Sequence, residues 1–187
     1  MNNEIIVAIS GASGVQYGIR LLETLKRTKG VKTNLVLSDS AKQLIEIETD
    51  HSVRDVENLA DHVYKDDDFT APIASGSHRS KGMIVAPCSM KSLASIAMGM
   101  SDTLLSRAAD VCLKEKRPLI LMVRETPLNL IHIENMARAA RAGASILPAS
   151  PAFYPKPGSI DDMIDFMAGR ALDLLGIEHN LYKRWRE

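Results

Sequence analysis

The sequence predicts a three-layer α/β sandwich built around a mostly parallel sheet of at least five strands. Five short apolar runs alternate with segments of helical periodicity. Several of these runs are continuous rather than alternating, which is typical of strands that are covered on both faces. Strands that alternate with helices form right-handed crossovers, so helices are expected on both sides of the sheet.

The predicted strands are the runs in which aliphatic and β-branched side chains gather. They cover residues 4–10, 32–37, 82–87, 118–123 and 144–148. The crossover from 39 to 81 is too long for a simple connection and should contain one or two helices and a long loop. Long loops in compact domains are often binding loops.

The helices are predicted from apolar spacing and from their starting residues. Apolar side chains recur at helical spacing from Val15 to Leu25. Thr126 and Pro127 read as the N-cap and first residue of a helix toward Arg141. Ser159, followed by two aspartates, caps a final helix. Further helices are predicted over 89–97 and around Leu105, Ala108 and Cys112.

Length and composition favour one globular domain over residues 1–187, with a C-terminal helix and tail. Lysine plus arginine and aspartate plus glutamate both number 23, so no nucleic-acid or anionic membrane partner is indicated. The two cysteines are too few for a disulfide framework or a zinc site. The sequence shows no signal peptide and no apolar stretch of about 18 residues, so we expect a cytoplasmic protein.

The glycine-rich stretch SGASGVQYG follows the first strand and opens a helix. A tight turn at a helix N-terminus gathers backbone N–H groups, which suits a phosphate, and Ser13 adds a hydroxyl donor. The alternative is a plain strand-to-helix turn. Gly11, Gly14 and Gly18 do not fit the dinucleotide pattern G-x-G-x-x-G. That pattern also needs an acidic residue at the end of the second strand, where the sequence reads Ser38-Asp39, so this criterion does not decide between the two. A mononucleotide such as FMN needs no such ribose contact.

Polar residues follow other predicted strands as well. Ser89 and Ser92 follow the third strand, Arg124 and Glu125 follow the fourth, and Tyr154 lies in a loop after the fifth. Ligands of open α/β sheets bind at the carboxyl ends of the strands, so these loops predict one common site. Taken singly, the serines are equally typical of helix caps and the tyrosine of a packing anchor.

Charged residues leave similar alternatives open. Lys114 and Arg170 suit phosphate binding but are also typical of solvated helix faces. Glu48 is either a buried carboxylate with a raised pKa or a solvated glutamate. The DDD stretch at 66–68 is more typical of an exposed loop than of a metal site, and the histidines show no ligand spacing, so no metal is expected.

Eight stretches, in the same order, resemble the UbiX-type flavin prenyltransferases over nearly the whole chain. They are SGASGVQYG, VLSDSAK, ASGSHR, APCSMKSLASIA, LSRAADVCLKEKRPLILMVRETPL, IHIENM, PAFYPKP and KRW. The resemblance implies a flavodoxin-like Rossmann sandwich assembled as a homododecamer. It implies transfer of a dimethylallyl group from dimethylallyl monophosphate to N5 and C6 of reduced FMN, without metal. The product, prenylated FMN, would pass to a UbiD-type decarboxylase.

The resemblance also implies roles for residues at matching positions. FMN contacts fall on Gly11, Ala12, Ser13, Ser38, Ser89, Met90, Lys91, Ser92 and Arg124. The prenyl-phosphate site falls on Tyr154 and Arg170, with Arg107, the loop of Ala74, Ser75, Gly76 and Ser77, and Trp185 in a closing tail. Catalytic positions fall on Glu48, Lys114 and Glu125.

Two other FMN-dependent functions and one dehydrogenase function remain as alternatives. Decarboxylases of the cysteine or phosphopantothenoylcysteine type share the fold, but their P-x-M-N-x-x-M-W signature is absent from this sequence. A protein that stores and delivers FMN would not need Lys114, Tyr154 and Arg170 together. The glycine spacing disfavours an NAD(P)-dependent dehydrogenase.

Overall fold

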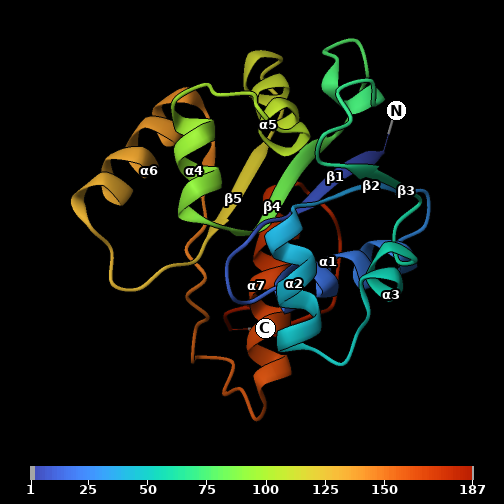
Figure 1. Ribbon diagram of the computed structural model, residues 1–187. Coiled ribbons are helices and arrows are strands. Elements are labelled where there is room, and N and C mark those ends of the chain that lie inside the picture. The colour runs from blue at the N-terminus through green and yellow to red at the C-terminus, as the bar shows by residue number, and fades with distance from the viewer. Residues whose placement is uncertain (1–2, 187) are drawn as a thin grey trace.

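A computed structural model describes residues 3–186, and these contain one six-stranded sheet in which neighbouring strands are all parallel (Figure 1). The strand order is β3-β2-β1-β4-β5-β6. Strands β2 and β3 are added on one side of β1 and strands β4 to β6 on the other, so the order of the strands reverses between β1 and β4. Ligands of doubly wound sheets bind at this switch point. The strands are β1 (Glu4–Ile9), β2 (Lys32–Leu37), β3 (His62–Lys65), β4 (Gly82–Cys88), β5 (Leu119–Val123) and β6 (Ser145–Ile146).

Helices cover both faces of the sheet, and the predicted three-layer sandwich is confirmed. Alternate residues of β1 enter two separate cores: Ile5 and Val7 pack with α1 and α7, whereas Ile6 and Ala8 pack with α4 and α5. Continuous apolar strands are therefore explained by burial on both faces. The helices are α1 (Gln16–Arg27), α2 (Asp39–Glu48), α3 (Val53–Glu57), the 3-10 turn η1 (Pro72–Ala74), α4 (Met90–Ala97), α5 (Leu104–Lys114), α6 (Leu130–Ala142) and α7 (Ile160–Leu174).

Three details differ from the sequence predictions. The 39–81 crossover contains a strand, β3, in addition to helices; β3 is a short edge strand in which Val63 is 42% exposed, so it carries no apolar run. The helix predicted to begin at Pro127 begins at Leu130, because Asn129 accepts a hydrogen bond from the His132 N–H and forms a capping box. The strand predicted over 144–148 is regular over Ser145–Ile146 only, although the Leu147 and Ala149 N–H groups also donate to carbonyls of β5.

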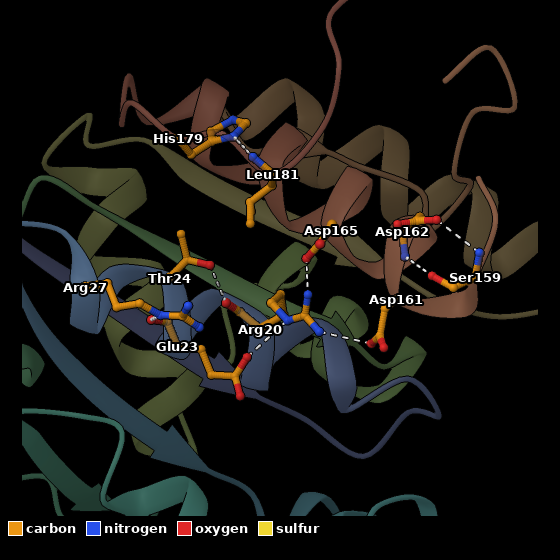
Figure 2. Close-up of polar contacts among 10 residues, drawn as sticks. All are labelled: Arg20, Glu23, Thr24, Arg27, Ser159, Asp161, Asp162, Asp165, His179 and Leu181. Carbon is orange, nitrogen blue, oxygen red and sulfur yellow. Dashed lines mark hydrogen bonds and ion pairs between the residues drawn. The ribbon is translucent and has the colours of Figure 1, made fainter. Parts of the chain in front are cut away.

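Arg20 joins α1 to α7 at the surface of one helical layer (Figure 2). Its guanidinium contacts Asp165, lies 3.0 Å from Asp161 Oδ1 and lies 3.1 Å from Glu23 Oε2. The Arg20 side chain is 23% exposed, so this group of charges is partly shielded from water. The pairing helps fix α7, whose later residues belong to the predicted prenyl-phosphate site.

Candidate active site

A cavity of about 270 Å³ lies at the carboxyl edge of the sheet, where the loops after β1, β2, β3, β4 and β5 meet. It brings together seven of the predicted site residues: Gly11, Ser38, Ser89, Met90, Lys91, Ser92 and Glu125. The other lining residues are Ser40, Asp66, Ser95, Asp102, Thr103, Leu105 and Ser106. The cavity thus joins the loops that carry Ser89, Ser92 and Glu125, whereas Arg124 and Tyr154, which were predicted to share the same site, do not line it.

Three helix N-termini converge on this cavity. Ser38, Ser89 and Thr103 are the N-caps of α2, α4 and α5, and all three line it. Each side-chain oxygen accepts a backbone N–H of its own helix at 3.2 Å. Ser89 is therefore a helix cap, as one reading of the sequence predicted, whereas Ser92 lies inside α4 and donates its N–H to Ser89. The same caps point three helix dipoles and their first N–H groups toward one anion-sized space.

Ser10 connects the two strands at the switch point, a role that the sequence analysis did not identify. Its fully buried hydroxyl donates to the Pro87 carbonyl at 2.9 Å and accepts the Ser89 N–H at 2.8 Å. The start of the loop after β1 and the start of α4 are thus fixed to each other. A serine within SGASG, directly after an apolar strand, was the available signal.

The glycine-rich turn is shaped by close packing and by backbone conformation. A Cβ on Gly11 would lie 2.5 Å from the Ser40 Cβ, so α2 approaches the turn closely only because this residue is glycine. Gly14 has φ +100°, a conformation that side chains disfavour. Ala12 is buried, whereas Ser13 is exposed, and neither lines the cavity.

The burial of Glu48 is intermediate between the buried and the solvated positions considered from the sequence. Glu48 lies at the end of α2, and its Oε2 accepts the Gly14 N–H at 2.8 Å and the Val15 N–H at 3.4 Å. A carboxylate at the beginning of α1 is stabilised by the helix dipole. Glu48 therefore holds the shape of the glycine-rich turn.

Arg124 and Glu125 follow β5 as predicted, and both are exposed. The Glu125 Oε1 accepts the Thr126 N–H at 2.9 Å. Arg124 interacts electrostatically with Tyr17, a residue of the glycine-rich stretch to which the sequence assigned no role. Burial raises the pKa of the Tyr17 hydroxyl, and the nearby Arg124 partly offsets that rise.

Aromatic residues form a second group beside α7. Tyr154 contacts Trp185 edge-on, with ring centroids 5.0 Å apart, and Phe166 at 5.9 Å. Phe166 in turn contacts Tyr182 at 4.8 Å, and the Tyr182 hydroxyl lies 3.4 Å from Nη1 of Arg170. The C-terminal tail thus packs on the loop of Tyr154, and Tyr154 and Arg170 belong to one connected cluster.

A third group of cations lies along α5 and just beyond its C-terminal end. Arg107 Nε donates to the Ala74 carbonyl at 3.0 Å, and Lys114 contacts the loop at Gly76, where an added Cβ would lie 2.6 Å from its Nζ. Arg117 donates to the Gly76 carbonyl at 2.7 Å. Lys114 lies about 12 Å further along the helix than Ser106 of the cavity. Within one chain, neither Lys114 nor a residue of the 74–77 loop lines the cavity.

Comparison with known proteins identifies the family. The sequence matches the Flavoprotein family over residues 1–172. It is 51% identical to the flavin prenyltransferase UbiX of Methanothermobacter thermautotrophicus over 181 residues, which are 97% of this chain and 94% of that protein. The chain belongs to the UbiX family of flavin prenyltransferases.

Solved structures of UbiX proteins agree with this membership. AnUbiX (PadA1), crystallised in complex with FMN and dimethylallyl pyrophosphate, superposes with a TM-score of 0.97 at 49% identity, covering 100% of this chain and 99% of that one. The dodecameric FMN-dependent UbiX-like decarboxylase of Escherichia coli O157:H7 superposes with a TM-score of 0.96 at 47% identity, covering 98% and 100%. The fold expected from the resemblance is confirmed.

In this UbiX-family chain, the acidic stretch 66–68 has structural contacts. Asp66 Oδ1 accepts the Leu105 N–H at 2.8 Å, and burial raises the pKa of its carboxyl group. Asp68 accepts the Thr70 N–H and hydroxyl.

Residues 3–186 contain no group of three or more histidine, cysteine or acidic side chains arranged to hold a metal. Across the same residues, no helix has the length and apolar character needed to span a membrane.

Proposed function

We propose that this protein transfers a dimethylallyl group from dimethylallyl monophosphate to N5 and C6 of reduced FMN. Residues 1–187 would act as one FMN-binding domain in the cytoplasm. The observation that carries the proposal is the convergence of three serine- or threonine-capped helix N-termini on one cavity, at the switch point of a UbiX-family chain. The UbiX relative crystallised with FMN and dimethylallyl pyrophosphate supports this pair of ligands.

The residues around the cavity fit the phosphate of FMN. Ser38, Ser89 and Thr103 begin helices of eight or more residues, which present N–H groups and positive dipole ends to an anion. The Lys91 side chain adds a cation at the same edge. The cavity of one chain is slightly smaller than the range of about 300–1,000 Å³ typical of ligand sites. Bound FMN would therefore extend beyond the cavity of a single chain.

The donor phosphate would be held by cations and a phenol. Breaking the allylic C–O bond places negative charge on the departing phosphate. Arg170 and Tyr154 would stabilise that charge through charge-assisted hydrogen bonds that are in place before the reaction. Arg124, Arg107 and Lys114 would add further positive charge.

Reduced FMN, when bound, supplies the two atoms to which the dimethylallyl group becomes attached. The protein's part is to hold the donor carbons against those atoms, which contributes a large proximity effect. Glu125 lines the cavity and is the carboxylate proposed to accept the proton released on ring closure. Glu48 would contribute indirectly: by accepting the Gly14 and Val15 N–H groups, it would keep the glycine-rich turn in the shape that faces FMN.

We propose that the working form is a homododecamer that delivers prenylated FMN to a UbiD-type decarboxylase. Large apolar side chains are exposed on and near α4 and α6: Met98, Met100, Leu128, Leu130, Ile131 and Ile133. Such a surface is typical of subunit contacts. The separation of Lys114 from the cavity agrees with a site that is completed by a neighbouring copy. Light scattering should give a mass twelve times the 20.5 kDa of one chain; a monomer would contradict the assembly.

The reaction can be tested directly. The protein is mixed without oxygen with reduced FMN and dimethylallyl monophosphate, and the mass of the extracted flavin is measured. A gain of one dimethylallyl unit is expected, and a parallel sample with the pyrophosphate tests donor preference. Unmodified FMN after long incubation with either donor would overturn the proposal in favour of storage or decarboxylation.

A further inference from the structure

Asp173 collects four hydrogen bonds from α7 and from the C-terminal tail. Its Oδ2 accepts from Arg170 Nη1 at 2.9 Å and from the Tyr182 hydroxyl at 2.5 Å. Its Oδ1 accepts from Arg184 Nη2 at 2.8 Å and lies 3.2 Å from His179 Nε2. Only 16% of the Asp173 side chain is exposed, so one largely buried carboxylate connects four side chains.

The ionisation states in this cluster are consistent with its geometry. Burial alone would raise the pKa of Asp173, but hydrogen bonds from Tyr182 and Arg184 lower it to about 2. The Leu181 N–H donates to His179 Nδ1 at 3.2 Å (Figure 2), so the proton of a neutral His179 lies on Nε2 and points to Asp173. The carboxylate is therefore ionised and accepts from every partner.

The same cluster fixes the course of the tail over α7. The rings of His179 and Tyr182 lie directly over Gly169, where an added Cβ would be 2.7 Å and 2.6 Å from them. The His179 side chain is 1% exposed. Three residues further on, Trp185 contacts Tyr154. The contacts of Asp173 thus extend through the tail to the loop that carries the predicted phosphate-binding tyrosine.

We propose that Asp173 is a positioning residue for the prenyl donor, which it serves by orienting Arg170 and by holding the tail against α7. Among the described residues, the polar contacts of the Arg170 guanidinium use Nη1, which leaves Nε and Nη2 for a phosphate. The Arg170 side chain is 43% exposed, so a ligand can reach it. This inference rests on the proposed function, because it assigns the donor phosphate to Arg170.

The test compares the prenylation kinetics of Asp173→Asn and Tyr182→Phe with the parent protein. Asp173→Asn keeps the shape of the side chain but removes its charge. Tyr182→Phe removes one hydroxyl and keeps the ring that packs on Phe166. Both should raise the KM for dimethylallyl monophosphate, Asp173→Asn by about fivefold or more, while FMN affinity stays unchanged, since the cavity does not include either residue.

A double-mutant cycle separates positioning from a general loss of stability. If Asp173 acts through Arg170, then Asp173→Asn changes the KM far less in an Arg170→Lys background than in the parent. Asp61→Asn is the matched control, because it removes a carboxylate that accepts the Thr33 N–H and hydroxyl at the amino ends of β2 and β3. It should lower the melting temperature without changing the KM.

The possible failures are distinguishable. A parent protein that leaves FMN unmodified removes the proposed function itself. A parent that prenylates FMN, together with Asp173→Asn at parental KM, overturns the role of Asp173. Equal effects of Asp173→Asn with and without Arg170 also overturn it, because the contribution would then be purely structural.

Discussion

Replacing Arg20 by methionine should destabilise the protein measurably, because one guanidinium serves three carboxylates. Methionine keeps the apolar stem of the side chain, so the loss is mainly electrostatic. The Asp161 side chain is 73% exposed, and Glu23 is an i,i+3 partner on the same helix. Losing each of these two ion pairs should lower the free energy of unfolding by at most about 0.5 kcal/mol. Asp165 is only 22% exposed, and losing its charge-assisted bond costs about 1.5–2 kcal/mol. The sum is about 2–3 kcal/mol.

For a chain of this length, that loss corresponds to a fall in melting temperature of about 5–10 °C. The assay is thermal unfolding followed by circular dichroism at one protein concentration, after light scattering has shown an unchanged assembly. Lys42→Met is the matched control: its partner Asp39 is 94% exposed, so its loss should lower the melting temperature by less than about 2 °C.

A shift for Arg20→Met no larger than that of the control would refute the reasoning. It would mean that the cost of desolvating Arg20 cancels its attraction to the carboxylates. A second measurement tests the same point from the other side. In the Arg20→Met background, Asp165→Asn should recover part of the lost stability, because it removes the carboxylate left without a partner.

Three further predictions follow from glycine packing, thiol burial and acid titration. Gly18→Ala should cost about 3 kcal/mol, because its Cβ would lie 2.4 Å from a β4 carbonyl, whereas Gly158→Ala, with its nearest atom at 3.7 Å, should leave the melting temperature unchanged. Burial raises the pKa of Cys88 to about 12 and of Cys112 to about 11, so a thiol reagent at pH 8 should label both only after unfolding. Because the folded pKa of Asp173 is about 2, below its ordinary 3.8, its stabilisation should persist above pH 4 and be lost between pH 4 and pH 2; a melting-temperature profile that Asp173→Asn does not flatten there would contradict this.

The sequence predicted the interior of the fold better than its edges, and the reason is physical. Strands β1, β4 and β5 are buried on both faces, so their sequences are continuous apolar runs. β3 lies at the sheet edge and reads HVYK, which has no such run. The start of α6 was misplaced because two capping signals compete within four residues. Thr126-Pro127 fits the first turn of a helix, yet Asn129 forms the actual capping box.

The predicted site shows a similar division between local and distant contacts. Ser38 and Ser89 could be placed from the sequence, because each follows its strand directly and begins a helix. The bonds of Glu48 to the Gly14 N–H and of Asp173 to Tyr182 could not, because nothing local in either stretch specifies its partner.

The glycine-rich turn shows why this division matters for function. Its glycine spacing already disfavoured the dinucleotide pattern, and Ser13 was the residue expected to donate to FMN. In the fold, Ser13 is exposed and lies outside the cavity lining, whereas Ser10 and Glu48 hold the turn from either side. Hydrogen bonds to the residue after β4 and to the end of α2 thus fix the conformation of the turn. The proposed phosphate recognition rests on the capped starts of α2, α4 and α5, so removing the Ser89 or Ser38 hydroxyl should weaken FMN binding, measured by flavin titration, more than removing that of Ser13.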